Sequence, residues 1–172
     1  MRCKGSVFRT TVQMFIRKNI PLPCEKLKTM DVVRLKQAQH RDARGCLSVV
    51  EVARQLPFAV GRVFWITDVP AEARRGGHAH WRCHEALYVA SGGVTVVLSE
   101  PRRSGDGSGV VQIVDHVVEL SPTADGVVIP AGVWCELTGF APGTVLVVLA
   151  SEPYDATGYC HDRRKWEVAI GY

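Results

Sequence analysis

Short apolar runs, rich in β-branched residues, alternate with turn residues from Asp31 to the end of the chain. β-Branched runs are typical of strands, and separators such as Ser91-Gly92-Gly93 and Ala141-Pro142-Gly143 are typical of turns. Eight short strands with little helix between them predict an all-β protein, a double-sheet jelly roll. The predicted strands are residues 47–52, 60–66, 86–90, 94–98, 110–118, 127–129, 133–137 and 144–150.

Three segments depart from this simple pattern. Residues 145–149 are continuously apolar, which predicts a strand buried on both faces. Residues 52–55 are the only mid-chain candidate for a helical turn. From Glu152 the tail turns polar and aromatic, so we expect it to wrap over the barrel mouth or a subunit seam.

A chain of 172 residues fits one domain, and we predict a single jelly-roll domain over residues 31–172. Residues 1–30 have weak periodicity, and their basic residues mostly precede the first acid, Glu25. An organellar presequence and a docked amphipathic helix are two interpretations of this segment. We adopt a third, an N-terminal extension that is poorly ordered or lies upstream of the true start.

Composition narrows the function classes. Hydrophobic residues make up 47% of the chain and charged residues 22%. Both proportions are typical of globular proteins. No apolar run approaches the length of a membrane helix, roughly 20 residues. The net charge of +4 is dispersed, so we expect no nucleic-acid partner, although a small polyanion stays open. The six cysteines form no Cys-x-x-Cys pair and no secretory segment is visible, which favours reduced thiols in the cytoplasm.

The most informative motif is Arg75-Gly76-Gly77-His78-Ala79-His80. Residues two apart on an extended strand point to the same side, so the two imidazoles share one face. An imidazole pair inside a barrel can bind a metal, move protons, or do both.

The neighbours of this motif resemble a known family. His78-x-His80-x4-Glu85-x6-Gly92 resembles the first motif of the cupin barrels, and Pro130-x-Gly132-x2-Cys135 resembles the second, with Cys in place of His. Within the cupins, the chain from about Met30 onward is similar to the nucleotide-sugar 3,4-ketoisomerases. The segments that carry this similarity are Asp42-Ala43-Arg44-Gly45, Leu56-Pro57-Phe58, Arg62-Val63-Phe64, Arg75–His80, Val133-Trp134, 147–151, Tyr154-Asp155 and Tyr159.

The resemblance implies a homodimeric cupin-type jelly roll, in which an N-terminal strand can be exchanged between subunits. It implies action on dTDP-4-keto-6-deoxyglucose with no metal or other cofactor. The chemistry is consistent with this, because a 4-ketone acidifies the proton at C3. One base can remove that proton to form an enediol, and a proton returned at C4 leaves the ketone at C3.

For this reaction we expect one of His78 and His80 to be the base and the other to shuttle protons between the sugar oxygens. His80 is preferred as the base because it is the more interior residue. Two adjacent imidazoles resist being charged together, which keeps at least one of them neutral. Forked guanidinium groups suit phosphate oxygens, so Arg62 and Arg75 are the candidate ligands of the sugar and diphosphate. Arg62 has a plain salt bridge as its alternative. The remaining candidates for substrate binding are Trp65, Glu85, Tyr88 and Trp134, and each aromatic one has a core position as its alternative.

Three departures from the family pattern leave other functions open. Phe64 and Trp65 stand where the family often has paired tyrosines, so a phenol from elsewhere, such as Tyr88, would have to assist proton movement. Glu85 stands in place of Gln, where it would hydrogen-bond a sugar hydroxyl or orient a histidine. With Cys135 in place of His, one alternative is a metal-dependent cupin enzyme with His78, His80, Glu85 and Cys135 as ligands. A second alternative is a non-catalytic module that binds nucleotide sugars.

Overall fold

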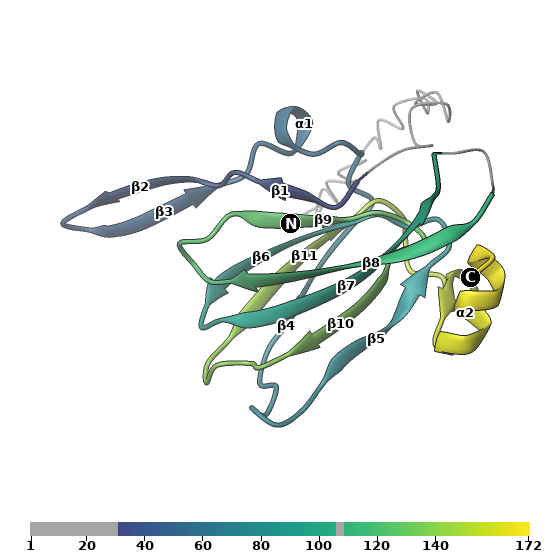
Figure 1. Cartoon of the computed structure of the whole chain (residues 1–172). Coiled ribbons are helices and arrows are strands. Elements are labelled where there is room, and N and C mark those ends of the chain that lie inside the picture. Colours follow the sequence, from purple (N-terminus) through teal and green to yellow (C-terminus); the bar gives the residue numbers. More distant parts are fainter. Residues whose placement is uncertain (1–30, 106–108) are drawn as a thin grey trace, which may run out of the picture.

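Two five-stranded antiparallel sheets face each other in the computed structural model, which describes residues 31–105 and 109–172 (Figure 1). The predicted extension, residues 1–30, lies outside the described residues. The first sheet contains, in order, β1 (Val33–Leu35), β9 (Gly126–Ile129), β6 (Glu85–Ser91), β11 (Val145–Ala150) and β4 (Arg62–Ile66). The second contains β12 (Tyr159–Cys160), β5 (Arg75–His80), β10 (Trp134–Thr138), β7 (Val94–Arg103) and β8 (Val111–Leu120). The predicted jelly roll is therefore confirmed.

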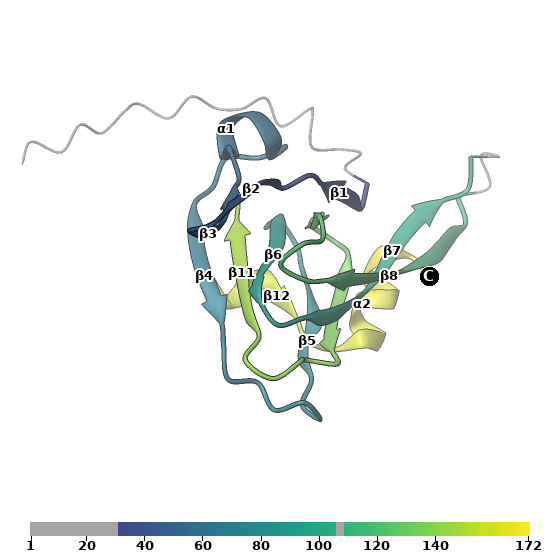
Figure 2. The same ribbon diagram turned by 90° about the vertical axis from the view of Figure 1, so that its left-hand side faces the viewer.

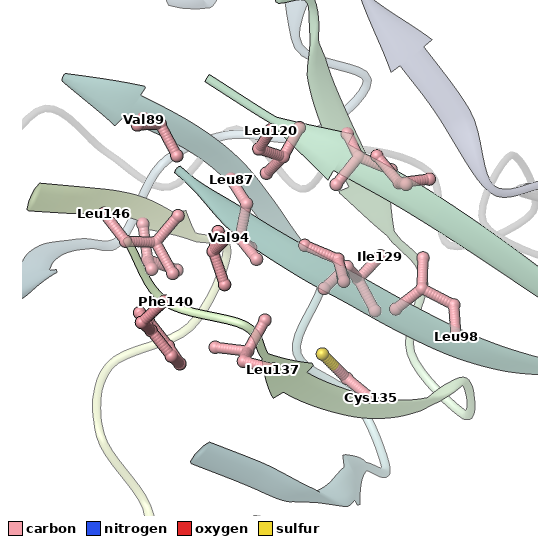
Figure 3. Packing of buried hydrophobic residues seen from close by; sticks show 14 of the residues in the cluster. Leu87, Val89, Val94, Leu98, Leu120, Ile129, Cys135, Leu137, Phe140 and Leu146 are labelled. Atoms are coloured by element: carbon pink, nitrogen blue, oxygen red, sulfur yellow. The ribbon is translucent and has the colours of Figure 1, made fainter. Parts of the chain in front are cut away.

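Alternate side chains of both sheets fill the space between them (Figure 3). Leu87 and Val89 of β6 and Leu146 of β11 pack against Leu98 of β7 and Leu137 of β10. Figure 2 shows the sheets edge on, with β4 and β11 on one side and β7 and β8 on the other. Each of these five residues is at most 4% exposed, so this cluster supplies the main hydrophobic stabilisation.

Most predicted elements are present. Each predicted strand overlaps an observed one, and the predicted helical turn is α1 (Val52–Gln55). The prediction for β11 was wrong in one respect, because Val145, Val147 and Leu149 are only half-buried while the alternate residues are buried. No helix in the described parts of the chain is long and apolar enough to span a membrane.

A two-stranded ribbon of β2 (Ala38–Asp42) and β3 (Gly45–Val49) projects from the barrel (Figure 1). Among the described residues its strands pair only with each other. Leu47 on β3 is 61% exposed. Isolated ribbons of this kind are at best marginally stable in water.

Helix α2 (Arg163–Ile170), which the sequence analysis did not predict, covers the outer face of the second sheet. The Asp162 carboxylate accepts hydrogen bonds from the first-turn amides of Arg164 and Lys165 and so caps the helix. Trp166 is fully buried against Ala79 of β5. The tail therefore ends on the outside of the barrel, while its earlier part, from Glu152 to Tyr159, lines a cavity described below.

Two hydrogen bonds connect this helix to the strand that carries the histidines. The Trp166 indole donates to the carbonyl of Gly132 (2.8 Å). The amide of Gly132 in turn donates to the carbonyl of His80 (2.7 Å). The backbone of His80 is thus fixed from outside the barrel.

Candidate active site

Alternation along β5 directs the two histidines into the barrel. Ala79 is completely buried on the outer face beneath Trp166, so His78 and His80 on either side of it point inward. A larger side chain at Ala79 would collide with the helix. The short alanine thus lets α2 approach closely and hold the strand in place.

An irregularity in β5 brings Arg75 to the same side as the histidines. The register with β10 shifts between Cys135 and Glu136, opposite the glycines that follow Arg75. Gly76 has a φ of +76°, and a Cβ there would lie 2.6 Å from the Cys135 carbonyl oxygen. Only glycine fits such a position. A bulge of this kind re-aims neighbouring side chains, and Arg75 lines the cavity that contains His78 and His80.

Four rings form a contiguous group, which we call the imidazole–tyrosine cluster: His78, His80, Tyr159 and His161. The ring centroids of His78 and His80 are 5.0 Å apart in an edge-on arrangement. Tyr159 lies 4.3 Å from His80 and 5.1 Å from His78. His161 stacks on Tyr159 at 5.5 Å and 5°.

The environment of His78 favours its neutral form. Burial lowers its pKa below the ordinary value, and the neighbouring His80 lowers it further. A hydrogen bond with the backbone of Gly76 and the charge of Glu85 act on this pKa in the opposite direction. The mutual repulsion expected from the His-x-His spacing is therefore present, although burial is the larger cause.

His80 lies beside a buried carboxylate. Its Nε2 atom is 3.2 Å from Oε1 of Glu85, and the two side chains are 8% and 10% exposed. The alignment is not that of a hydrogen bond, so Nε2 is buried without a hydrogen-bond partner among the described residues. Arg62 approaches the same oxygen at 4.0 Å. The carboxylate of Glu85 is therefore close enough to orient the ring of His80, one of the two roles expected for it from the sequence.

Two cavities meet at the cluster. The larger, of about 410 Å³, lies between the sheets and is lined by His78, Glu85, Trp65, Arg74 and Arg75 among others. The smaller, of about 230 Å³, is lined by Arg62, Arg82, Tyr154 and other tail residues. His80 and Tyr159 line both cavities. A ligand that occupied the two cavities would pass directly over these two side chains.

The structure brings most of the predicted site residues together. His78, His80, Arg75, Glu85 and Trp65 line the larger cavity, where Trp65 is 68% exposed at the edge strand β4. Arg62 lines the smaller cavity, and its guanidinium carbon lies 5.6 Å from the centre of the Tyr154 ring.

Two predicted residues lie elsewhere. Tyr88 packs with Leu56 and Phe58 in a second core cluster, because it is on the opposite face of β6 from Leu87. Trp134 faces outward, packs against Trp166, and donates from its indole to Glu136 (3.0 Å). Neither Tyr88 nor Trp134 lines either of the two cavities.

The four proposed metal ligands, His78, His80, Glu85 and Cys135, all line the larger cavity. Within the described ranges, no group of three or more His, Cys, Asp and Glu residues is arranged to hold a metal ion. Cys135 is 7% exposed and packs into the core beside Leu98 and Leu137. Burial, and to a lesser extent the charges of Glu85 and Glu136, raise the pKa of its thiol well above the ordinary value. This geometry gives the metal-dependent alternative no support.

Sequence reasoning did not select Tyr159, His161 or Arg82 as site residues. Tyr159 and His161 are two apart, the same spacing that identified His78 and His80, and this was a usable signal. Arg82 lies in the turn after β5, 3.6 Å from Asp155 of the tail. Its role at the smaller cavity depends on a contact between segments far apart in sequence, which spacing alone does not predict.

Comparison with known proteins agrees with this geometry. The model of the WxcM-like, C-terminal family (FdtA) matches residues 28–170. A TDP-4-oxo-6-deoxy-alpha-D-glucose-3,4-oxoisomerase from Aneurinibacillus thermoaerophilus is 34% identical over 118 residues, which are 69% of this chain and 77% of that enzyme.

Two solved structures are also similar. One is a His-to-Asn variant of the 3,4-ketoisomerase QdtA from Thermoanaerobacterium thermosaccharolyticum in complex with TDP-4-keto-6-deoxyglucose (30% identity, TM-score 0.69, 81% of this chain and 93% of that chain). The other is a 3,4-ketoisomerase from Helicobacter canadensis (27% identity, TM-score 0.71, 84% of this chain and 100% of that chain). Because the family model spans most of the chain, this protein belongs to the WxcM-like, C-terminal family.

Proposed function

We propose that this protein is a sugar 3,4-ketoisomerase that moves the keto group of a dTDP-4-keto-6-deoxyhexose from C4 to C3. The observation that carries the proposal is the position of the His80 Nε2 atom. This atom is buried without a hydrogen-bond partner among the described residues, and it lies 3.2 Å from Glu85 where the two cavities meet. Two of the similar enzymes support this substrate: the Aneurinibacillus enzyme is named for a TDP-linked keto sugar, and the QdtA variant is in complex with one.

His80 is the proposed base. A neutral imidazole takes the proton from C3, and the nearby Glu85 carboxylate stabilises the imidazolium that results. Return of a proton to C4 completes an internal oxidation and reduction that needs no nicotinamide. The lowered pKa of His78 keeps this second imidazole neutral beside a charged His80, so it is able to accept a hydrogen bond from the substrate.

Arginines at the two cavities are the proposed ligands of the diphosphate and sugar. Arg75 and the exposed indole of Trp65 lie at the larger cavity, where an aromatic surface and a guanidinium suit a nucleotide. Arg62 lies at the smaller one, and its Nε atom is buried without a hydrogen-bond partner among the residues that the structure describes. Such an atom gains a bond when an anionic or hydroxyl oxygen enters.

The proposed activity is tested by incubating the protein with dTDP-4-keto-6-deoxyglucose in deuterated buffer and following the sugar by NMR. We expect the ketone to move from C4 to C3 and deuterium to enter at C3 or C4, because the transferred proton passes through an exchangeable imidazole. The conversion should persist in EDTA, since the donors at the described site do not form a metal-binding group.

Two results would contradict this function. Substrate that stays unconverted and unlabelled, while dTDP still binds, would identify a non-catalytic nucleotide-sugar module instead. Activity that disappears in EDTA and returns with added metal would restore the metal-dependent alternative.

We also propose that two copies of the chain form a homodimer through the ribbon of β2 and β3. The ribbon has no strand partner outside itself among the described residues and exposes Leu47, so a second copy would cover it. The expected mass in solution is twice that of the 18.9 kDa chain. Leu47→Asp should shift the protein toward the monomer in light scattering, and a wild-type monomer would refute the proposal.

The proposed setting is the cytoplasm, in the biosynthesis of deoxysugars for polysaccharides. Cys46, Cys83, Cys135 and Cys160 are all free thiols, as expected in a reducing compartment. The measurement that checks this is fractionation of cells, with the enzyme followed by its isomerase activity.

A further inference from the structure

We infer that Tyr159 is a further catalytic residue, whose hydroxyl carries a proton between the two sugar oxygens, O4 and O3, during the ketone shift. This inference rests on the proposed function. It gives the site the phenol that the sequence analysis found missing at Phe64 and Trp65 and sought in Tyr88.

The placement of Tyr159 is the first argument. Strand β12 pairs antiparallel with β5, and Tyr159 is the register partner of His80. The ring centroids are 4.3 Å apart, and both residues line both cavities. A sugar whose C3 proton reaches His80 therefore also meets Tyr159.

The second argument is that Tyr159 is held in place. His161 stacks on one side of its ring at 5.5 Å, and Tyr154 lies 5.9 Å away. The preceding turn is closed by the carboxylate of Asp155, which accepts hydrogen bonds from the amide (2.9 Å) and hydroxyl (2.7 Å) of Thr157. The carbonyl of Gly158 accepts a hydrogen bond from the amide of Trp81 (2.9 Å), next to His80. A ring fixed in this way is prepared for proton transfer at a defined position.

The other phenols near the barrel do not meet these conditions. The hydroxyl of Tyr88 is buried in the second core cluster without a hydrogen-bond partner among the described residues, and burial raises its pKa to about 12. Tyr154 is 70% exposed and lines only the smaller cavity of the two. Phe64 and Trp65, which line the larger cavity, have no hydroxyl.

The proton transfers balance. His80 first removes the proton from C3, which leaves an enediolate with the charge on O4, and the Tyr159 hydroxyl then gives its proton to O4 to form the enediol. The phenolate then takes the proton from the hydroxyl at O3, and the imidazolium delivers a proton to C4. The sugar gains a ketone at C3 and a hydrogen at C4, and both side chains return to their starting states without an external oxidant or reductant.

The test is Tyr159→Phe, which removes one oxygen and keeps the ring. Loss of an acid–base group costs about 10²- to 10⁴-fold, so we expect ketone transfer to fall by about 100-fold or more while dTDP affinity is unchanged. Removal of the C3 proton depends on His80 and should fall less. The amount of deuterium at C3 of the recovered substrate, divided by the amount of product formed, should therefore rise. Loss of a Tyr159 side chain with only a structural role would not raise this ratio.

Tyr88→Phe is the matched control, because it makes the same chemical change outside both cavities, and it should retain wild-type turnover. If the wild type is active and Tyr159→Phe is equally active, the inference is wrong while the proposed function stands. A folded Tyr159→Phe variant in which exchange and turnover fall in parallel also contradicts the oxygen-shuttle role. An inactive wild type would contradict the proposed function, and this inference with it.

Discussion

His80→Asn is expected to lower the rate of ketone transfer by about 10²- to 10⁴-fold, the usual effect of removing a general base. Asparagine is close to histidine in size and polarity but cannot accept a proton at neutral pH. Because Glu85 would keep its approach from Arg62, we expect the buried carboxylate to remain partnered and the fold to be retained. NMR would follow both product formation and deuterium entry at C3, and both should fall together.

Binding of dTDP provides the internal control for this variant. The proposed diphosphate ligands, Arg62 and Arg75, are not altered, so the dissociation constant for dTDP should stay near the wild-type value. His40→Asn makes the same substitution on β2, away from both cavities, and should be fully active. If His80→Asn kept more than a tenth of the wild-type rate, the base would have to be another residue, and His78 would be the next to replace.

Trp166→Ala is expected to lower the free energy of unfolding by about 3–5 kcal/mol, as truncation of a buried aromatic side chain typically does. Trp166 is fully buried, packs on Ala79 and Trp134, and has the guanidinium of Arg163 4.4 Å from its ring centre. Its loss would leave a cavity between α2 and β5 and would remove the hydrogen bond to Gly132. Urea unfolding, followed by circular dichroism, measures the change.

Two further variants separate the contributions at Trp166. Val168 belongs to the same helix but is 77% exposed. Val168→Ala should therefore change the free energy of unfolding by less than about 0.5 kcal/mol. Trp166→Phe keeps an aromatic ring but leaves the Gly132 carbonyl without its indole donor, which should cost about 1–3 kcal/mol. A Trp166→Ala protein as stable as Val168→Ala would show that α2 is dispensable for the barrel.

The strands were predictable because their apolar runs are bounded by strong turn signals. Helix α2 was not predicted, although Asp162 before it and Gly171 after it are typical cap residues. Half of its residues are charged, and the helix depends on one tryptophan inserted into the sheet surface. Stability of this kind comes from tertiary packing rather than from local sequence.

The histidine pair was predictable because alternation along a strand is a local rule. The same rule argues against assigning both Trp134 and Cys135 to one site, since adjacent strand residues face opposite sides. Tyr88 was harder to place, because β6 is buried on both faces from Glu85 to Val89 and its pattern does not show which face is inside. To place Arg75 at the site, one has to know of the bulge opposite β10, and to place Tyr159 there, one has to know that β12 pairs with β5. Both features join distant parts of the chain.

The hydrogen-bonded path from Trp166 through Gly132 to His80 also has a consequence for biosynthesis on the ribosome. Synthesis proceeds from the N-terminus, so β5 leaves the ribosome long before α2, which covers its outer face. Until Trp166 arrives, Ala79 is exposed and the backbone of His80 lacks the support of an anchored Gly132. Strand β5 thus gains its outer cover only in the last stage of translation, and we expect nascent chains that stop before Arg163 to hold both histidines less firmly.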